Sequence, residues 1–240
     1  MAKTEKDEMF NSEEVEVNNN SKFDFEETVD KTEDFVMKNK KIIAYIVGAI
    51  IIVVMGIFLF LKVYIPGKET EAQNQMFVAE KYFEKEDFNK ALNGDGNYPG
   101  FLKIIDDYSF TKSSNIAKYY AGICNLKLGK FEQAIPLLEG FDSDDMIVAP
   151  MAIGAIGDAY MELGKTEEGI KYYLKAAEKN ENNFSSPMFL LKAAFAYEDL
   201  NKYKEALDTY ELIRTKHFRS QEGREVEKYI ARVKVLMENK

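Results

Sequence analysis

The chain has 240 residues, of which 46% are hydrophobic, and its formal net charge is −9. This is enough apolar material for one sizeable core. A nucleic-acid partner requires a basic face that displaces counterions from phosphates, and no segment beyond residues 38–65 offers one, so we expect no nucleic-acid binding.

The first 37 residues are acidic, with a net charge of −8 and a polar cluster at Asn18–Ser21. They show no sustained hydrophobic period. Low hydrophobicity combined with high net charge is typical of segments that cannot build a core. The sequence therefore predicts a disordered acidic tail over residues 1–37.

Residues 42–61 form an uninterrupted uncharged run. As a helix, 20 residues span about 30 Å, the hydrocarbon thickness of a bilayer. A cleavable signal peptide would lie nearer the N-terminus, with a shorter apolar core and a small-residue cleavage site. We therefore predict a retained transmembrane anchor over residues 38–66 that contacts the lipid bilayer through residues 42–61.

Orientation rests on the lysines beside this run. Lys31, Lys38, Lys40 and Lys41 precede it, whereas Lys62 and Lys68 follow closely. Such a bias favours a cytoplasmic N-terminus. The sequence thus predicts a single-pass protein of the inner (cytoplasmic) membrane with its C-terminal domain in the periplasm.

From residue 70 onward apolar residues recur at intervals of three and four, which predicts an all-α domain. Self-similar segments begin at Gly122, Gly157 and Ala194, 35 and 37 residues apart. These intervals are close to the 34-residue period of tetratricopeptide repeats, helix-turn-helix units that stack into a solenoid. We place the domain at 70–240, with units of about 72–110, 115–149, 150–186 and 187–220.

Each matched position has a physical role. Gly122, Gly157 and Ala194 let the second helix of a unit cross closely over the first, and the small residue twelve positions later is the counterpart on that second helix. Gly129, Gly164 and Asn201 lie where a left-handed residue would end the first helix. Tyr173 and Tyr210 are expected to fill the gap to the next unit.

A degenerate unit precedes these three, with Ala79 and Ala91 at the same offsets and the segment Leu92–Gly100 inserted into its second helix. Asn93, Asp95 and Asn97 alternate as calcium ligands do, but the glycine and glutamate of an EF-hand loop are absent, so we expect a turn and no metal. Residues 221–238 read as an amphipathic cap over the last unit.

Residues 70–240 resemble the tetratricopeptide family, and the acidic tail, anchor and short solenoid together resemble the YfgM type of bacterial inner-membrane protein. That resemblance implies an accessory subunit of the Sec translocon. Its partners would be polypeptides: translocon subunits, a membrane-anchored chaperone or prolyl isomerase, and unfolded clients. The alternative is a structural assembly factor of an envelope secretion or outer-membrane biogenesis complex.

The sequence offers no catalytic set, metal cluster or Gly-rich phosphate loop, so we expect a chain that is not an enzyme and needs no cofactor. Cys124 lies on an apolar helical stripe, which predicts a buried thiol. His217 lies in a polar run without metal-ligating partners.

In tetratricopeptide repeats the first helix of each unit lines the binding groove. Counting inward positions from each small residue predicts a groove rich in methionine and aromatic side chains and edged by acids, which favours client segments flanked by Lys or Arg. The alternative is that the cap or neighbouring units bury these side chains. The predicted groove residues are Met76, Phe83, Tyr119, Ile123, Leu126, Met151, Asp158, Met161, Glu162, Met188, Leu191, Phe195 and Glu198.

Overall fold

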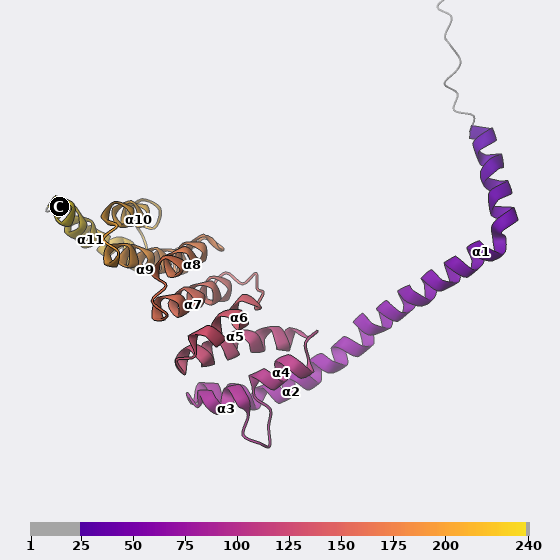
Figure 1. The fold of residues 1–240 in the computed structure, drawn as a ribbon, viewed down its shortest axis with the longest axis horizontal. Helices are drawn as coiled ribbons and strands as arrows, with labels where there is room; N and C mark the ends of the chain where they lie inside the picture. Colours follow the sequence, from indigo (N-terminus) through magenta and orange to yellow (C-terminus); the bar gives the residue numbers. More distant parts are fainter. Residues whose placement is uncertain (1–24, 239–240) are drawn as a thin grey trace, which may run out of the picture. The chain divides into compact units, whose positions relative to one another are not determined.

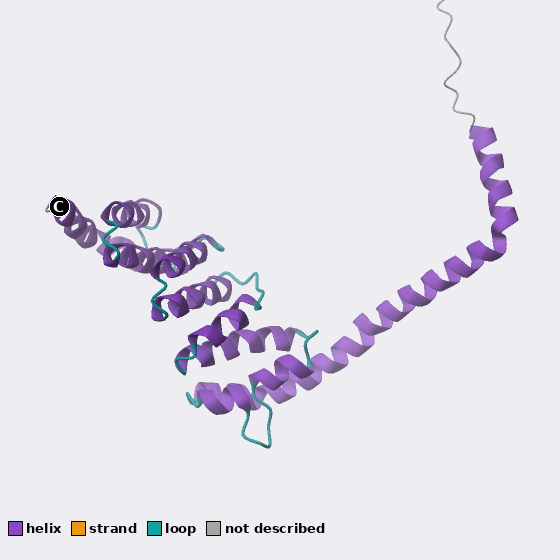
Figure 2. Ribbon diagram, in the orientation of Figure 1, coloured by secondary structure: helices purple, strands orange, loops and turns teal. Residues whose placement is uncertain are grey.

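A computed structural model describes residues 25–238 of the chain (Figure 1). Its regular structure in this range is helical, with no strand (Figure 2). The all-helical prediction is therefore confirmed for the described residues. The chain divides into two compact units, Met1–Phe58 and Leu59–Lys240.

The first unit is built on helix α1, Phe25–Leu59. The helix thus begins well before Lys38, so the expectation of a disordered tail is corrected for residues 25–37. Extending an existing helix requires no new nucleation, which explains how a stable apolar helix continues into polar sequence. Residues 1–24 lie outside the described part of the chain.

Among the described residues one helix, Val36–Glu84, is long and apolar enough to cross a membrane, and none of its most apolar stretch is buried within the protein. It includes a short π-helical turn, η1, at Phe60–Tyr64. Pro66 follows this turn in the first positions of α2. Proline supplies no backbone N–H and displaces the carbonyl four residues earlier, here that of Lys62, so a widened turn is needed at this place.

The second unit stacks antiparallel helix pairs from α2 to α11 (Figure 1). The first helices are α2 (Ile65–Glu84), α5 (Lys112–Lys127), α7 (Val148–Glu162) and α9 (Ser185–Asp199). Their partners are α3 (Phe88–Asn93) with α4 (Phe101–Asp107), α6 (Phe131–Glu139), α8 (Thr166–Glu178) and α10 (Tyr203–Lys216), and α11 (Gln221–Glu238) closes the stack.

The turn between the two helices of each pair follows one pattern. Gly129, Gly164 and Asn201 have φ of 70°, 71° and 55°. In each case the next residue's N–H donates to the carbonyl five residues earlier, as Lys165 does to Tyr160 at 2.9 Å, which is the Schellman arrangement. The predicted left-handed positions are confirmed. In the degenerate first repeat, Glu86 occupies the same position, with φ of 59°.

Close helix crossing is visible at α7 and α8. A Cβ added to Gly157 would lie 2.7 Å from two ring carbons of Tyr173 and 3.2 Å from the carbonyl oxygen of Gly169. One added to Gly169 would lie 3.3 Å from the carbonyl oxygen of Gly157. The two glycines therefore face each other across the crossing, as their twelve-residue separation predicts.

The insertion in the first repeat separates α3 from α4, so the second helix of that repeat is divided into two short helices. Gly94 and Pro99 form an isolated antiparallel bridge across it. Asp95 closes the turn because its carboxylate accepts from the backbone N–H groups of Asn97 and Tyr98 and from the Tyr82 hydroxyl, the last at 2.7 Å. The described residues hold no cluster of three or more potential metal ligands.

Buried side chains from both helix layers and from α11 make up the core. Tyr210, Ile213, Val226 and Val233 are all fully buried. On α11 the buried side chains are those of Val226, Ile230 and Val233, which lie on one face of the expected amphipathic cap. Helix α11 thus covers the apolar surface that the last pair would otherwise expose.

Candidate functional site

One groove of the solenoid lies on the face formed by the first helices α5, α7 and α9, with a volume of about 450 Å³. Because these helices are parallel neighbours, side chains one repeat apart line up along it. Its floor is mostly apolar and its margin carries four charged groups. The lining residues are Tyr119, Ile123, Leu126, Lys127, Phe131, Met151, Ala155, Asp158, Met161, Glu162, Tyr173, Met188, Phe189 and Lys192.

The central part of the sequence-predicted set comes together here. Those residues are Tyr119, Ile123 and Leu126 from α5, Met151, Asp158, Met161 and Glu162 from α7, and Met188 from α9. The three methionines lie on two adjacent helices around one cavity. An unbranched thioether adapts to apolar partners of different shape, so this floor suits varied side chains.

Two predicted residues lie in α2, the first helix of the first repeat, and outside the groove. Met76 is only 6% exposed and belongs to the core between α2 and α5. The ring of Phe83 packs edge-on against those of Phe88, Phe101 and Tyr120. The predicted set is therefore corrected here, because the split helix α3–α4 supplies aromatic rings that cover this end of the face.

At the other end Leu191, Phe195 and Glu198 also lie outside the groove. The ring of Phe195 packs edge-on against Tyr210 and Tyr229, the latter from α11. Glu198 accepts hydrogen bonds from the Tyr210 hydroxyl at 2.5 Å and from Arg232 at 2.6 Å. These positions are corrected because the cap helix occupies the face, which is the alternative that the sequence left open.

Lys192, Tyr173 and Phe189 line the groove although inward counting missed them. The Lys192 ammonium reaches from α9 to Oδ1 of Asp158 on α7 at 2.6 Å, and the Tyr173 hydroxyl donates to the same oxygen at 2.6 Å. Lys192 and Asp158 are 34 residues apart, one repeat length, and that spacing of opposite charges was the available signal.

This pairing changes the electrostatics expected of the groove. Asp158 is matched by Lys192, and Lys127 accompanies Glu162 on the margin. The margin is therefore balanced rather than acidic, and the predicted preference for Lys- or Arg-flanked segments is not supported by its charge. Burial, followed by the hydrogen bond to Asp158, raises the pKa of Tyr173 well above its ordinary range, so its hydroxyl remains a donor.

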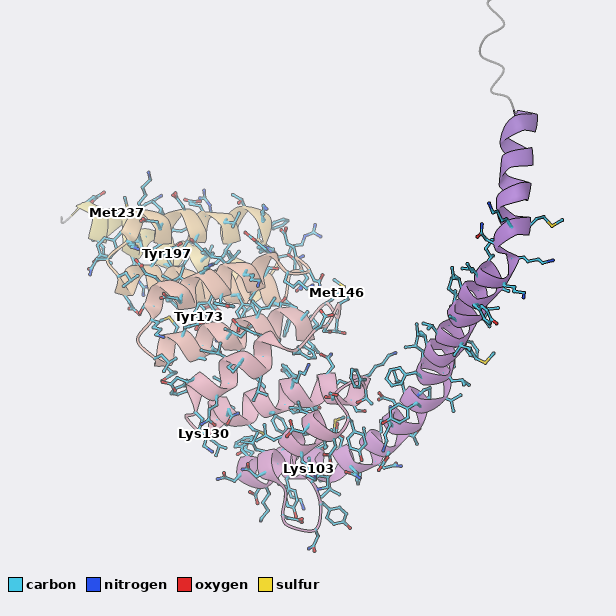
Figure 3. The ribbon with its side chains drawn as sticks, turned by 45° about the vertical axis from the view of Figure 1, so that its right-hand side comes forward. Lys103, Lys130, Met146, Tyr173, Tyr197 and Met237 are labelled. Carbon is cyan, nitrogen blue, oxygen red and sulfur yellow. The ribbon has the colours of Figure 1, made fainter. Side chains whose placement is uncertain are left out.

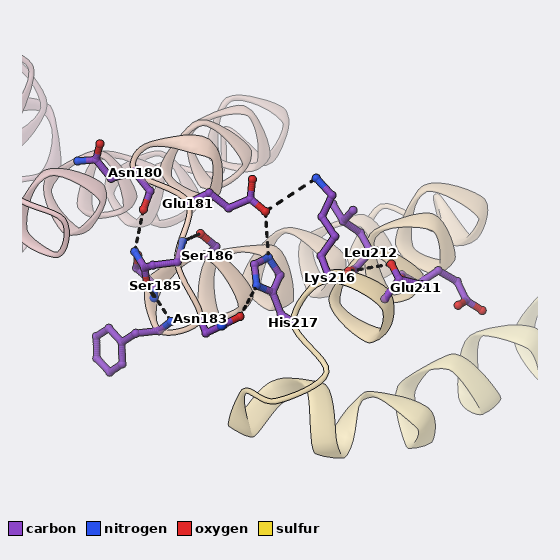
Figure 4. A network of polar contacts seen from close by, with 12 residues as sticks. Asn180, Glu181, Asn183, Ser185, Ser186, Glu211, Leu212, Lys216 and His217 are labelled. Atoms are coloured by element: carbon purple, nitrogen blue, oxygen red, sulfur yellow. Dashed lines mark hydrogen bonds and ion pairs between the residues drawn. The ribbon is translucent and has the colours of Figure 1, made fainter.

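The single cysteine and the single histidine of the chain both lie outside this groove. Cys124 is fully buried, and burial raises the pKa of its thiol to about 12, so it is uncharged and inaccessible. The expected buried thiol is confirmed. His217 is 4% exposed at the end of α10, where Nδ1 lies 3.1 Å from Oδ1 of Asn183 and Glu181 approaches from the other side (Figure 4).

Comparison with known proteins addresses the repeats directly. Residues 152–183 and 189–217 each match a family model described as tetratricopeptide repeat. Two crystal structures of nearly identical TPR-like repeats, assigned to a kinesin light chain of Podosopora anserina, share the fold at a TM-score of 0.51. Their sequences are 15% and 16% identical to this chain. Both matches cover 69% of this chain, and they cover 85% and 86% of the two solved chains. The search among curated proteins finds no match.

Proposed function

We propose, from the premise that this chain contains tetratricopeptide repeats, that it is a membrane-anchored binding module whose groove between α5, α7 and α9 receives an extended polypeptide segment. The observation that carries this proposal is the groove itself, in which Met151, Met161 and Met188 surround one cavity. Repeats of this type bind polypeptides through the surface that their stacking creates.

The anchor is the long apolar helix, whose stretch at residues 42–61 is long enough to cross a bilayer. The excess of lysines before it supports a cytoplasmic N-terminus and a periplasmic repeat domain. Alkaline phosphatase fused after Lys240 tests this topology. We expect an active enzyme, and activity of a cytoplasmic reporter at the same position would contradict it.

The resemblance of the whole architecture to the YfgM type supports a role beside the Sec translocon, with unfolded clients and folding factors as partners. Assembly of an envelope complex is the second candidate. The two differ in what is bound, so detergent extraction followed by affinity purification and mass spectrometry separates them. We propose no catalytic activity, since the buried Cys124 thiol offers no thiolate to a substrate.

Peptide capture by the full chain in detergent tests the groove. Changing both Met161 and Met188 to Ser removes two apolar floor side chains and should weaken binding of an apolar peptide by about 2 kcal/mol if they are hot-spot contacts. Phe195 is left unchanged because α11 packs on it.

Met237→Ser is the matched control, because this methionine is 41% exposed on α11, away from the groove. It should bind the peptide as the wild type does. Equal affinity of the groove variant and the control, with helicity retained in both, would refute the groove as the binding site.

A further inference from the structure

A row of exposed apolar side chains follows the loops that join one helix pair to the next. Phe110, Met146, Phe184 and Phe218 are 72%, 58%, 63% and 59% exposed. Each lies within three residues of the start of a first helix or of the cap: α5, α7, α9 and α11 respectively. Their spacing is one per repeat, so the row is as long as the stack.

Hydrogen bonds hold these loops side by side. The side-chain amide of Asn180 donates to the carbonyl oxygens of Asp144 and Asp145 at 3.3 and 3.2 Å, and that of Asn182 donates to Met146 at 3.2 Å. His217 Nδ1 continues the line to Asn183 in the preceding loop (Figure 4).

The line extends toward the start of the solenoid. The side-chain amide of Asn115 donates to the carbonyl of Asp142 at 2.6 Å and accepts from its N–H at 3.0 Å. Glu69, in the first turns of α2, accepts from the N–H of Lys112 and the hydroxyl of Ser113, both at 2.6 Å. The N-terminal ends of α2, α5, α7, α9 and α11 therefore lie along one edge. Figure 3 shows Met146 on this edge and Lys130 at the opposite one.

The apolar run of the anchor ends at this same edge. Its last residues, 59–61, belong to the repeat-containing unit and lead into the N-terminus of α2. The ring of Phe60 stacks on Tyr64 at 5.3 Å and packs edge-on against Phe110 at 5.9 Å. The first member of the exposed row thus touches the end of the span.

We propose that this row, Phe110, Met146, Phe184 and Phe218, rests on the surface of the bilayer that residues 42–61 cross. The inference depends on the proposed anchor. A span that enters at one end of the edge holds the other loops beside the lipid at high effective concentration, so weak insertion of single side chains suffices. Phenylalanine is among the apolar side chains that insert at the membrane interface when polar groups flank them.

Charge along the edge is mixed, which indicates what kind of bilayer it fits. Asp142, Asp144 and Asp145 lie near Met146, whereas Arg219 lies over the ring of Phe218, with 5.3 Å from Cζ to the ring centroid. A uniformly anionic surface would repel the loop that carries Met146 while it attracts the loop that carries Phe218. We therefore expect attachment through apolar contact, without a requirement for anionic lipid.

The absence of tryptophan from this sequence allows a direct test. The full chain is reconstituted in phosphatidylcholine vesicles with or without bromine on the acyl chains, carrying Phe184→Trp or Phe218→Trp. Bromine quenches indole fluorescence only at close approach. We expect both variants to lose fluorescence in brominated vesicles, and Lys165→Trp, in a turn at the opposite edge, to lose none.

Phe58→Trp reports the span separately. If it is quenched while the two edge variants are not, the edge proposal is wrong and the anchor stands. If bromine did not quench the fluorescence of Phe58→Trp, the anchor itself would be contradicted. A blue-shifted Phe184→Trp emission that bromine does not quench would show protein, such as a second copy, covering the edge, and would also overturn the proposal.

Cooperation along the row gives a second measurement. Adding Phe110→Ser and Phe218→Ser to the Phe184→Trp variant should reduce its quenching, because two neighbouring contacts with lipid are lost. Adding Phe77→Ser, which removes an exposed phenylalanine of α2 outside the row, should not. Equal quenching in both backgrounds would contradict a shared edge.

Discussion

The hydroxyl of Tyr173 on α8 donates to Oδ1 of Asp158 on α7 at 2.6 Å. Lys192 on α9 reaches the same oxygen, so a single carboxylate joins both helices of one unit to the first helix of the next. The next interface repeats the arrangement, with Tyr210 and Arg232 meeting at Glu198. Polar triads of this kind add directional contacts to the apolar packing between successive units.

Removing the Tyr173 hydroxyl should destabilise the solenoid measurably. Tyr173→Phe retains the ring and deletes a hydrogen bond to a carboxylate that is 42% exposed, so we expect a loss of about 1 kcal/mol in the free energy of unfolding. Chemical denaturation provides the measurement. Tyr172→Phe, which deletes a hydrogen bond to the exposed Glu139, is the control and should cost less; the reverse order would contradict a stabilising role of the triad.

Gly157→Ala should be destabilising because the added methyl would lie 2.7 Å from the Tyr173 ring, whose position the triad fixes. Overpacking of this kind costs about 1–3 kcal/mol. A thermal melt followed by circular dichroism measures it. Gly67→Ala in α2 meets no atom within 4 Å and should be neutral or slightly stabilising. An unchanged melting temperature for Gly157→Ala would refute the close crossing.

Glu86→Gly should stabilise the protein. Glu86 has φ of 59°, where an L-residue costs about 1–2 kcal/mol and glycine pays no steric penalty, although glycine gives back part of the gain as unfolded-state entropy. We expect a net gain of up to about 1 kcal/mol in denaturant unfolding. The reciprocal change Gly164→Glu, at the equivalent position with open space around it, should destabilise. A loss of stability in Glu86→Gly would show that the side-chain contacts of Glu86 outweigh the strain of its backbone.

His217 should make stability depend on pH. Burial, the largest cause, lowers its pKa below the ordinary 6.5, partly opposed by Glu181. Above 6.5 both states are neutral, so the folded state keeps its full stability. As the pH falls through 6.5 toward the lower folded-state pKa, the unfolded state takes up the proton first and stability is lost.

His217→Asn isolates this effect because the chain has no other histidine. The amide nitrogen of asparagine takes the place of Nδ1 and can still donate to Asn183. The difference in unfolding free energy between wild type and variant, measured from about pH 7.5 to about pH 5, should shift in favour of the variant. A difference that does not vary with pH would contradict a buried neutral imidazole.

The centre of the candidate groove was predictable from the sequence, and its two ends were not. Inward positions counted from Gly157 found Met161 because α7 has an equivalent neighbour on each side. At Phe195 the same count failed, since the neighbour there is the cap helix, and Tyr229 of that helix takes the place of a ligand. Lys192 was missed because counting positions within one helix does not show that its long side chain reaches a carboxylate one repeat away.

The sequence by itself determined the repeat period, the left-handed turns at Gly129 and Gly164, the split of the first unit's second helix and the long apolar run. These features depend on backbone geometry and hydrophobic spacing within a few turns of helix. Only the tertiary structure decided which inward faces stay open, how Asp158 is neutralised, and that Phe110 and Phe218 lie along one edge. The exposure of a side chain and the pairing of its charge depend on which helix packs against it in the stack. The spacing of residues within one helix does not predict that neighbouring helix.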